Sequence, residues 1–452
     1  MIDIKNKKIY FSGKGDQLSY EELEKFLLQN AVEFVPSIEQ AQLIIQGGLT
    51  PLHIQDMIYK ASTNNIQVVE IEEFEKFYSS QFSLNSTLMA AKLTKDNQRL
   101  VKLLQNKYFD DETFIKILKQ YDFKNTPLYD NDESRDVCRA IVNRFCTLVN
   151  RNHNIQYAPI GIYYTALEAL NADLLDIIYT MPSYTISDRT AKENQPLSLK
   201  EVVALNPNSS KSIQIQILQN NNIEELIYLA RNTNISDDIK SALKDKNIIN
   251  ITISLIKEEN YILGEVKDIL EDEYIKKEFL KYYHFNEKLF SEIIDYKLNN
   301  IDIINLSFNK YLTTNMIDTL ESKNIDNAII VLLKHDNISS ELINKYLKFN
   351  DKIYNIAIAH NIKLRDEQYQ ELFALNDLDI NISIAQNINM NINILKELHK
   401  YKNKNIDMML CENTSTPINI LMQLQLDNEL KLLVKENITY QKFAEKMLGF
   451  EG

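Results

Sequence analysis

The sequence predicts a multidomain protein in which a small α/β domain is followed by an all-α right-handed solenoid of about 26-residue repeats. Four of the eight glycines lie within the first 48 residues, and only Gly161 and Gly264 occur between 49 and 448. No proline lies between Pro207 and Pro417. Tight turns between strands usually need glycine, so this long second part suits short helices joined by Asn- and Ser-containing loops. We expect three segments, 1–82, 83–200 and 201–452.

The composition is that of a soluble globular chain, with 44% apolar and 25% charged residues among 452. No apolar run reaches the roughly 18 to 20 residues that a membrane span needs, and the N-terminus lacks a signal-peptide pattern. The three cysteines, Cys138, Cys146 and Cys411, make no disulfide framework. We therefore expect a cytoplasmic protein that does not engage membranes.

The first 80 residues alternate between strand and helix patterns. A strand ending at Gly13 is followed by a helix with Ser19 as N-cap and Glu22 completing a capping box. The later elements are strands at 32–35 and 41–46, a helix at 51–61, a strand at 67–71 and a helix at 72–78. The predicted order is βαββαβα.

This order and four short motifs resemble a BRCT domain of the type found in bacterial NAD-dependent DNA ligases. The motifs are Phe11-Ser12-Gly13, the stretch 21–25, the strand Leu43-Ile44-Ile45, and the stretch 69–74. The resemblance covers roughly residues 5–80, and two departures are Asn30-Ala31 in place of a Gly-Gly turn and the absence of a tryptophan in the last helix.

The resemblance implies a phosphate-binding turn, because such domains often bind phosphate on a protein or a DNA end. By that resemblance Ser12 and Gly13 fall at the contacting turn, and Lys14 adds positive charge. His53 lies where a lysine is expected in the second helix. A hydroxyl and a backbone N–H near a helix N-terminus suit an anion. The alternative is a simple strand-ending turn.

The body contains a repeat with a period of 26 residues. We define an anchor position in each copy, preceded two residues earlier by an apolar side chain. The anchors are Asn206, Asn232, Glu258, His284, Lys310, His335, Asn361, Asn387 and Asn413. We expect a helix to end at each anchor, where asparagine tolerates the left-handed conformation. Ser236, Ser339 or Thr416 then caps the next helix, with Pro417 in its first turn.

The repeat pattern is similar to leucine-rich repeat variant units, and a HEAT-like array is the alternative. Neither helix of a unit can bury its apolar stripe alone, so stacked copies share a core. The resemblance covers about residues 200–450. A fainter copy near residue 100 predicts that repeats begin there, with residues 125–205 as an insertion or as irregular repeats.

Four of the eight arginines lie close together in the middle segment, at Arg135, Arg139, Arg144 and Arg151. Arginine binds phosphate or carboxylate bidentately, which predicts an anion or nucleic-acid site, with His153 and Tyr157 as further candidates. The alternative is a salt-bridged helix, because Asp132, Glu133 and Asp136 lie within reach on the same helix.

No pattern for a metal, cofactor or catalytic site is present. The six histidines lack ligand spacing, and the sequence contains no phosphate-binding Gly-rich loop and no nucleophile motif. Cys138 and Cys146 are expected to be buried thiols. We therefore expect no cofactor and no metal.

These observations favour a non-enzymatic interaction or scaffold protein that binds a protein or peptide partner. One alternative is a DNA replication or repair factor that binds DNA ends or damaged DNA. The net charge of −13 disfavours it, and only residues 81–200 avoid a negative balance. Another alternative is an enzyme with an unrecognised site in 125–205.

Overall fold

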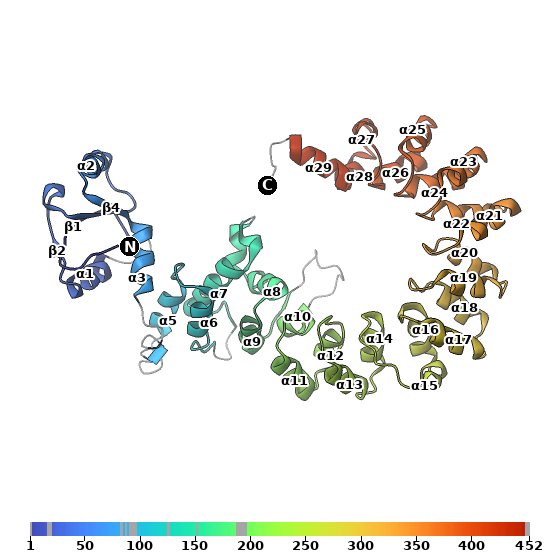
Figure 1. Ribbon diagram of the computed structural model, residues 1–452, viewed down its shortest axis with the longest axis horizontal. Helices are drawn as coiled ribbons and strands as arrows, with labels where there is room; N and C mark the ends of the chain where they lie inside the picture. Colours follow the sequence, from blue (N-terminus) through green and yellow to red (C-terminus); the bar gives the residue numbers. More distant parts are fainter. Residues whose placement is uncertain are drawn as a thin grey trace. The chain divides into compact units, whose positions relative to one another are not determined.

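The computed structural model describes residues 2–15, 20–81, 85, 88–89, 97–123, 127–150, 152–186 and 197–447. The chain divides into two compact units, Met1–Ala242 and Leu243–Gly452, which are described separately. The first unit contains a small α/β head and a set of helices, and the second unit is helical (Figure 1). The predicted α/β head and helical body are confirmed.

The head is built on a parallel four-stranded sheet with the strand order β2-β1-β3-β4. The strands are β1 (Lys8–Ser12), β2 (Glu33–Phe34), β3 (Leu43–Gln46) and β4 (Gln67–Glu70). The helices are α1 (Tyr20–Gln29), α2 (Leu52–Thr63) and α3 (Ile71–Ser80). The element order agrees with the predicted βαββαβα. Ser19, the predicted N-cap, lies outside the described residues.

Side chains of the central strand β3 alternate between two small cores. Leu43 and Ile45 pack with Leu23 and Leu27 of α1 and Phe74 of α3. Ile44, between them, packs on the other face with Ile58 and Ala61 of α2. This period of two explains why the strand is apolar throughout, since a parallel strand covered by helices on both faces has no side facing water.

The rest of the first unit is mainly helical. Its α-helices are α5 (Asn97–Leu104), α6 (Asp111–Leu118), α7 (Asp132–Phe145), α8 (Pro159–Glu168), α9 (Ala172–Thr180), α10 (Leu199–Leu205), α11 (Lys211–Asn220) and α12 (Ile223–Ala230). One short antiparallel pair, β5 (Thr185–Ile186) with β6 (Leu197–Ser198), interrupts them. At Gly161 an added Cβ would lie 2.4 Å from the carbonyl oxygen of Ile155, so this glycine permits α8 to approach its neighbours closely.

Helix α13 (Asp237–Lys244) leads into the second unit, which consists of short helices. They are α14 (Ile249–Lys257), α15 (Val266–Glu271), α16 (Glu273–Tyr282), α17 (Glu287–Asp295), α18 (Asn300–Ser307), α19 (Thr314–Glu321), α20 (Asp326–Leu332), α21 (Ser340–Phe349), α22 (Lys352–Ala359), α23 (Asp366–Ala374), α24 (Leu378–Gln386), α25 (Ile392–Lys400), α26 (Lys404–Glu412), α27 (Ile418–Leu424), α28 (Lys431–Glu436) and α29 (Ile438–Met447).

The helices of the second unit form two rows. Each even-numbered helix from α14 to α28 packs on the next even-numbered one, and odd-numbered helices such as α21 and α23 pack on the helix that follows them. Figure 1 shows the even-numbered row on the inner side of this unit and the odd-numbered row on the outer side. One apolar core runs from Ile256 to Val434 without interruption. The architecture is therefore repeat-like.

Buried asparagine side chains link successive repeats, and we call them the asparagine ladder. The side-chain amide of Asn387 donates to the main-chain carbonyls of Ala359, at 2.9 Å, and Asn361, at 2.8 Å. Its Oδ1 accepts from the backbone N–H of Asn389 at 3.0 Å. Each rung thus joins one repeat to the one before it and closes a local turn.

The same bonding recurs along the chain. In the first unit the rungs are Asn206 and Asn232. In the second unit they are Asn309, Asn361, Asn387, Asn413 and Asn437. At His335 an imidazole takes this place: Nε2 lies 3.0 Å from the carbonyl oxygen of Asn309, and Nδ1 accepts from the N–H of Asn337 at 3.1 Å.

Two details of the predicted repeat are wrong. The anchor asparagines are not left-handed, since Asn387 has φ −73° and Asn413 has φ −71°. The left-handed asparagines lie at the end of the other helix of each unit, for example Asn350 and Asn376, both with φ 50°. The anchor must instead stay extended because its side chain reaches into the preceding repeat. The rung predicted at Lys310 is Asn309, since α18 ends at Ser307.

The predicted helix caps are confirmed in part. Ser339 accepts a hydrogen bond from the N–H of Leu342 at 3.2 Å and caps α21. Thr416 is not a cap: it is buried, and Pro417 occupies the N-cap position of α27. Proline supplies the extended backbone that this position needs but no side-chain acceptor.

Candidate functional site

The predicted phosphate-binding residues lie around one turn of the head. Gly13 directly follows β1 and has φ +91°, and an added Cβ would lie 2.6 Å from the carbonyl oxygens of both Gly47 and Gly48. Lys14 pairs with Gly48 through two backbone hydrogen bonds, of 2.7 and 2.9 Å. This close approach of two chain segments explains Gly13 and Gly47, since a Cβ at either position would meet backbone atoms at less than 3 Å.

The turn leads directly into α2, where His53 is exposed in the first helical turn. The hydroxyl of Thr50 donates to the carbonyl of Gly47 at 2.8 Å, and the N–H of Gly47 donates to Ser12 at 2.6 Å. These backbone groups are therefore used within the turn. Lys14 and His53 are exposed and could meet an anion, whereas Ser12 is buried, so the binding of phosphate here stays a prediction.

Two of the predicted arginines make ion pairs within the fold. Arg135 makes an ion pair with Asp132 on its own helix α7. Arg144 binds Asp111 at the start of α6, with 2.7 Å between Nε and Oδ1, and also donates to the main-chain carbonyl of Phe109. Its guanidinium lies 4.9 Å from the centroid of the Phe114 ring. The Arg144 side chain therefore ties α7 to the beginning of α6.

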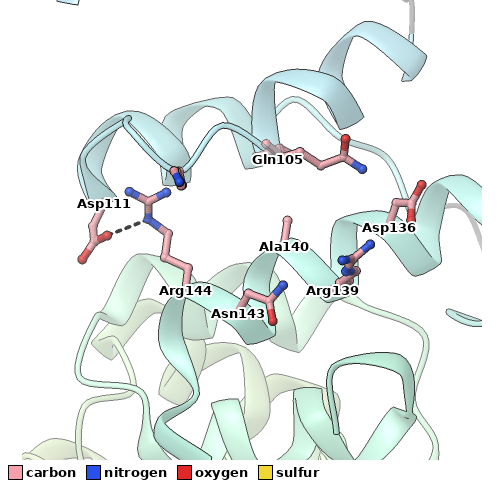
Figure 2. A pocket seen from close by; sticks show the side chains of 9 residues that line it. Gln105, Asp111, Asp136, Arg139, Ala140, Asn143 and Arg144 are labelled. Carbon is pink, nitrogen blue, oxygen red and sulfur yellow. Dashed lines mark hydrogen bonds and ion pairs between the residues drawn. The ribbon is translucent and has the colours of Figure 1, made fainter. Parts of the chain in front are cut away.

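Arg139 faces a groove of about 710 Å³ that α7 forms with α5 and the segment after it (Figure 2). Its Nε donates to Gln156 at 3.1 Å, and its guanidinium lies 5.0 Å from the centroid of the Tyr157 ring. The groove is lined by polar and charged side chains, among them Gln105, Lys107, Asp111, Asp136, Arg139, Asn143 and Arg144. The anion or nucleic-acid site predicted from the arginine cluster therefore corresponds to this groove.

The structure thus brings together Arg139 and Arg144 but not Arg135, which does not line the groove. Arg151 lies outside the described residues. Lys107, which the sequence did not single out, joins the groove and also makes an ion pair with Glu72 at 3.7 Å. Lys107 could not be found from spacing, because α5 and α7 meet only in the folded chain.

The cysteines are buried, as predicted for Cys138 and Cys146. Burial raises the pKa of the Cys138 thiol to about 12, although a hydrogen bond from Tyr129 acts in the opposite direction. Burial also raises the pKa of Tyr129 and Tyr184. At neutral pH these groups are therefore protonated, so they are poor nucleophiles and poor metal ligands.

Another candidate surface lies on the even-numbered row of the second unit. Half-buried apolar side chains recur at the position five residues before each rung, on the helix side roughly opposite the buried residue three before the rung, such as Ile358. They are Ile304, Ile330, Ile356, Ile382 and Met408. The sequence contained a signal for this surface, because consecutive residues of the set lie 26 positions apart. The helical period alone, however, does not distinguish a residue in the core from a residue at the exposed edge of the core.

Among the described residues, no cluster of His, Cys, Asp and Glu could hold a metal ion, and no helix has both the length and the apolar character needed to cross a bilayer. The fold defines a chain with an α/β head and a repeat-like helical body. Protein-family models, curated proteins and solved structures were searched, and none matches this chain.

Proposed function

We propose that this chain is a non-enzymatic scaffold in which a BRCT-like head and a right-handed α-solenoid of repeats, similar to leucine-rich repeat variant or HEAT-like units, bind protein partners. The asparagine ladder carries the proposal. Each rung buries an amide whose donors and acceptor are satisfied by backbone groups of two neighbouring repeats. Such a ladder fixes the spacing of successive helices, which suits a surface that recognises an extended partner.

The exposed side of the even-numbered row supports the same proposal. It presents large apolar side chains to solvent, including Ile301, 68% exposed, and Phe308, 55% exposed. Exposed apolar side chains that recur in register along one face are typical of interaction surfaces, whereas isolated ones are ordinary.

The test is affinity capture with the immobilised full chain from an extract of the source cells, followed by mass spectrometry. We expect one or a few proteins to be retained in amounts comparable with the bait. An unrelated acidic protein of similar size serves as the control. Retention of nothing beyond what that control retains would contradict the proposal.

A second candidate is a DNA replication or repair factor that binds DNA ends or damaged DNA. The groove that contains Lys107 and Arg139 favours this DNA-binding candidate. The groove lies within residues 81–200, the segment whose net charge is not negative. A gel-shift assay with nicked and 5′-phosphorylated duplexes would show binding that weakens between about 50 and 200 mM salt. The absence of binding at the lower salt would remove this candidate.

A further inference from the structure

The even-numbered row of the second unit carries one continuous face that we call the free face. In each helix it consists of the residues eight, five and one before the rung, which share one side of a helix. On α18 these are Ile301, Ile304 and Phe308, and the equivalent residues of α22 are Ile353, Ile356 and His360. Ile353 is 58% exposed, so the face offers apolar surface beyond its half-buried centre.

The free face becomes basic toward α16 and α20. On α16 the carbonyl of Leu280 accepts from Asn309 as that of Ala359 accepts from Asn387, so Leu280 lies two residues before the rung position and the face there consists of Tyr274, Lys277 and Lys281. On α20 the residue one before the rung is Lys334. Within the described part of the second unit, no carboxylate forms an ion pair with any of these three lysines. The ammonium of Lys281 lies 5.2 Å from the centroid of the Phe308 ring, which places positive charge directly beside the apolar surface.

The positive charge does not continue to the other end of the face. On α24 and α26 the equivalent residues include Asp379 and the exposed Glu412. Lys352, beside Asp379, is paired with both Asp377, at 3.0 Å, and Asp379, at 2.6 Å. The face is therefore aliphatic along its length, basic at one end and neutral to acidic at the other.

We propose that the free face from α16 to α24 binds a peptide segment of a partner protein that carries bulky apolar side chains and acidic residues. The inference rests on the proposed scaffold function and deepens it by naming the partner's chemistry. Apolar side chains of the peptide fit the Ile304–Ile330–Ile356–Ile382 stripe, and its carboxylates meet Lys277, Lys281 and Lys334.

The chemistry of the face favours a peptide over a single-stranded nucleic acid. A nucleic acid needs cations along its whole path and aromatic platforms for its bases. The centre of this stripe is isoleucine, and the end at Glu412 would repel phosphate. Packed helices lie about 8 to 10 Å apart, and an extended peptide covers about 3.3 Å per residue, so about 12 residues reach from α16 to α24.

The experiment selects binders to the full chain from a displayed library of random peptides of about 12 residues. We expect the enriched peptides to combine Asp or Glu with Leu, Ile or Phe. The binding of a synthesised winner is then measured by fluorescence anisotropy. The double variant Lys277→Glu/Lys281→Glu and the variant Ile353→Ser should each weaken it by about tenfold or more.

Matched controls separate the free face from general charge and apolarity. Lys323→Glu/Lys348→Glu makes the same charge change at exposed residues outside the face, and Ile392→Ser removes an apolar side chain of similar exposure on α25. Both should leave the affinity unchanged, and circular dichroism should show the same helix content in every variant.

Three results would overturn the inference: no enrichment, enrichment of peptides without acidic residues, or equal affinity of the winner for all variants. Tighter binding of an oligothymidylate than of any peptide would also overturn it. If the double variant still captures from cell extract the partner that the wild-type chain captures, the scaffold function stands and the assignment to the free face is wrong.

Discussion

Asn387 donates its side-chain amide to the main-chain carbonyl of Asn361, 26 residues earlier, at 2.8 Å. Asn361 in turn donates to the carbonyl of His335 at 3.0 Å. Both asparagines are buried. A buried amide is stabilising when every donor and acceptor is paired, and costly when a partner is removed. The asparagine ladder therefore stabilises the contact between repeats, and we expect substitutions of its rungs to lower the free energy of unfolding most.

Replacing a rung should destabilise the repeat body strongly. Asn387→Leu keeps the approximate volume but leaves the carbonyl of Ala359 and the N–H of Asn389 without a partner. The carbonyl of Asn361 then keeps only the hydrogen bond from the Tyr369 hydroxyl. We expect the free energy of unfolding to decrease by about 2 to 4 kcal/mol, measured by urea denaturation. Asn315→Leu, at an exposed position of α19, should change it by less than about 0.5 kcal/mol. Equal effects of the two variants would show that the rung adds nothing.

The turn of the head should reject a side chain at Gly13 but accept one at Gly48. Gly13→Ala combines a positive φ with a Cβ 2.6 Å from two carbonyl oxygens, whereas a Cβ at Gly48 would have its nearest neighbour at 3.8 Å. We expect Gly13→Ala to cost about 2 kcal/mol or more of head stability, and Gly48→Ala about 0.5 kcal/mol or less. Hydrogen exchange of the β1 and β3 amides would measure both, and similar protection in the two variants would contradict this account.

Lys276 lies between two carboxylates in the core of the second unit. Its ammonium is 2.8 Å from Glu273 and 3.3 Å from Asp302, whose side chain is 5% exposed. Lys276→Met leaves Asp302 buried without its cation, and we expect a loss of about 3 kcal/mol in the free energy of unfolding.

The double variant Lys276→Met/Asp302→Asn should recover part of that loss, because no charge then remains buried. As a control, Lys345→Met breaks an ion pair whose lysine side chain is half-exposed and should cost about 1 kcal/mol or less. A double variant no more stable than Lys276→Met would argue against an unpaired carboxylate as the cause.

His360 should make stability depend on pH. Burial, and to a lesser extent the positive charge of Lys334, lowers the pKa of His360 below its ordinary 6.5. The unfolded chain then takes up a proton near pH 6.5, whereas the folded chain takes it up only at lower pH. The free energy of unfolding should therefore fall as pH decreases from about 7 through the folded-state pKa.

The measurement for His360 is the melting temperature between about pH 7.5 and pH 5. His360→Gln should show a smaller decline over this range than the wild-type chain, because the proton-binding group is gone. His53→Gln, which alters an exposed histidine of the head, should show the wild-type decline. An unchanged decline in His360→Gln would assign the pH dependence to other groups.

For the arginine cluster, the sequence could predict the directions of the side chains on one helix but not their partners on other helices. Spacing on one helix could indicate that Arg135 and Arg144 point in different directions, and the structure agrees, since only Arg144 lines the groove with Arg139. It could not indicate that Asp111, on another helix, binds Arg144, or that Lys107 joins the groove. The phosphate-binding role suggested for Ser12, Gly13, Lys14 and His53 remains a prediction.

The sequence by itself determined the order of strands and helices in the head and the 26-residue period of the body. Both follow from local patterns: the spacing of apolar residues, and the asparagines and serines at which helices stop and start. Tertiary structure alone decided what the anchor asparagines do. Local preference predicts a left-handed conformation for the anchors, but the anchors are extended and buried against the preceding repeat. The left-handed conformation is found instead at residues such as Asn350. A local pattern determines where a helix ends, but only packed neighbours supply the carbonyls that a buried amide must meet.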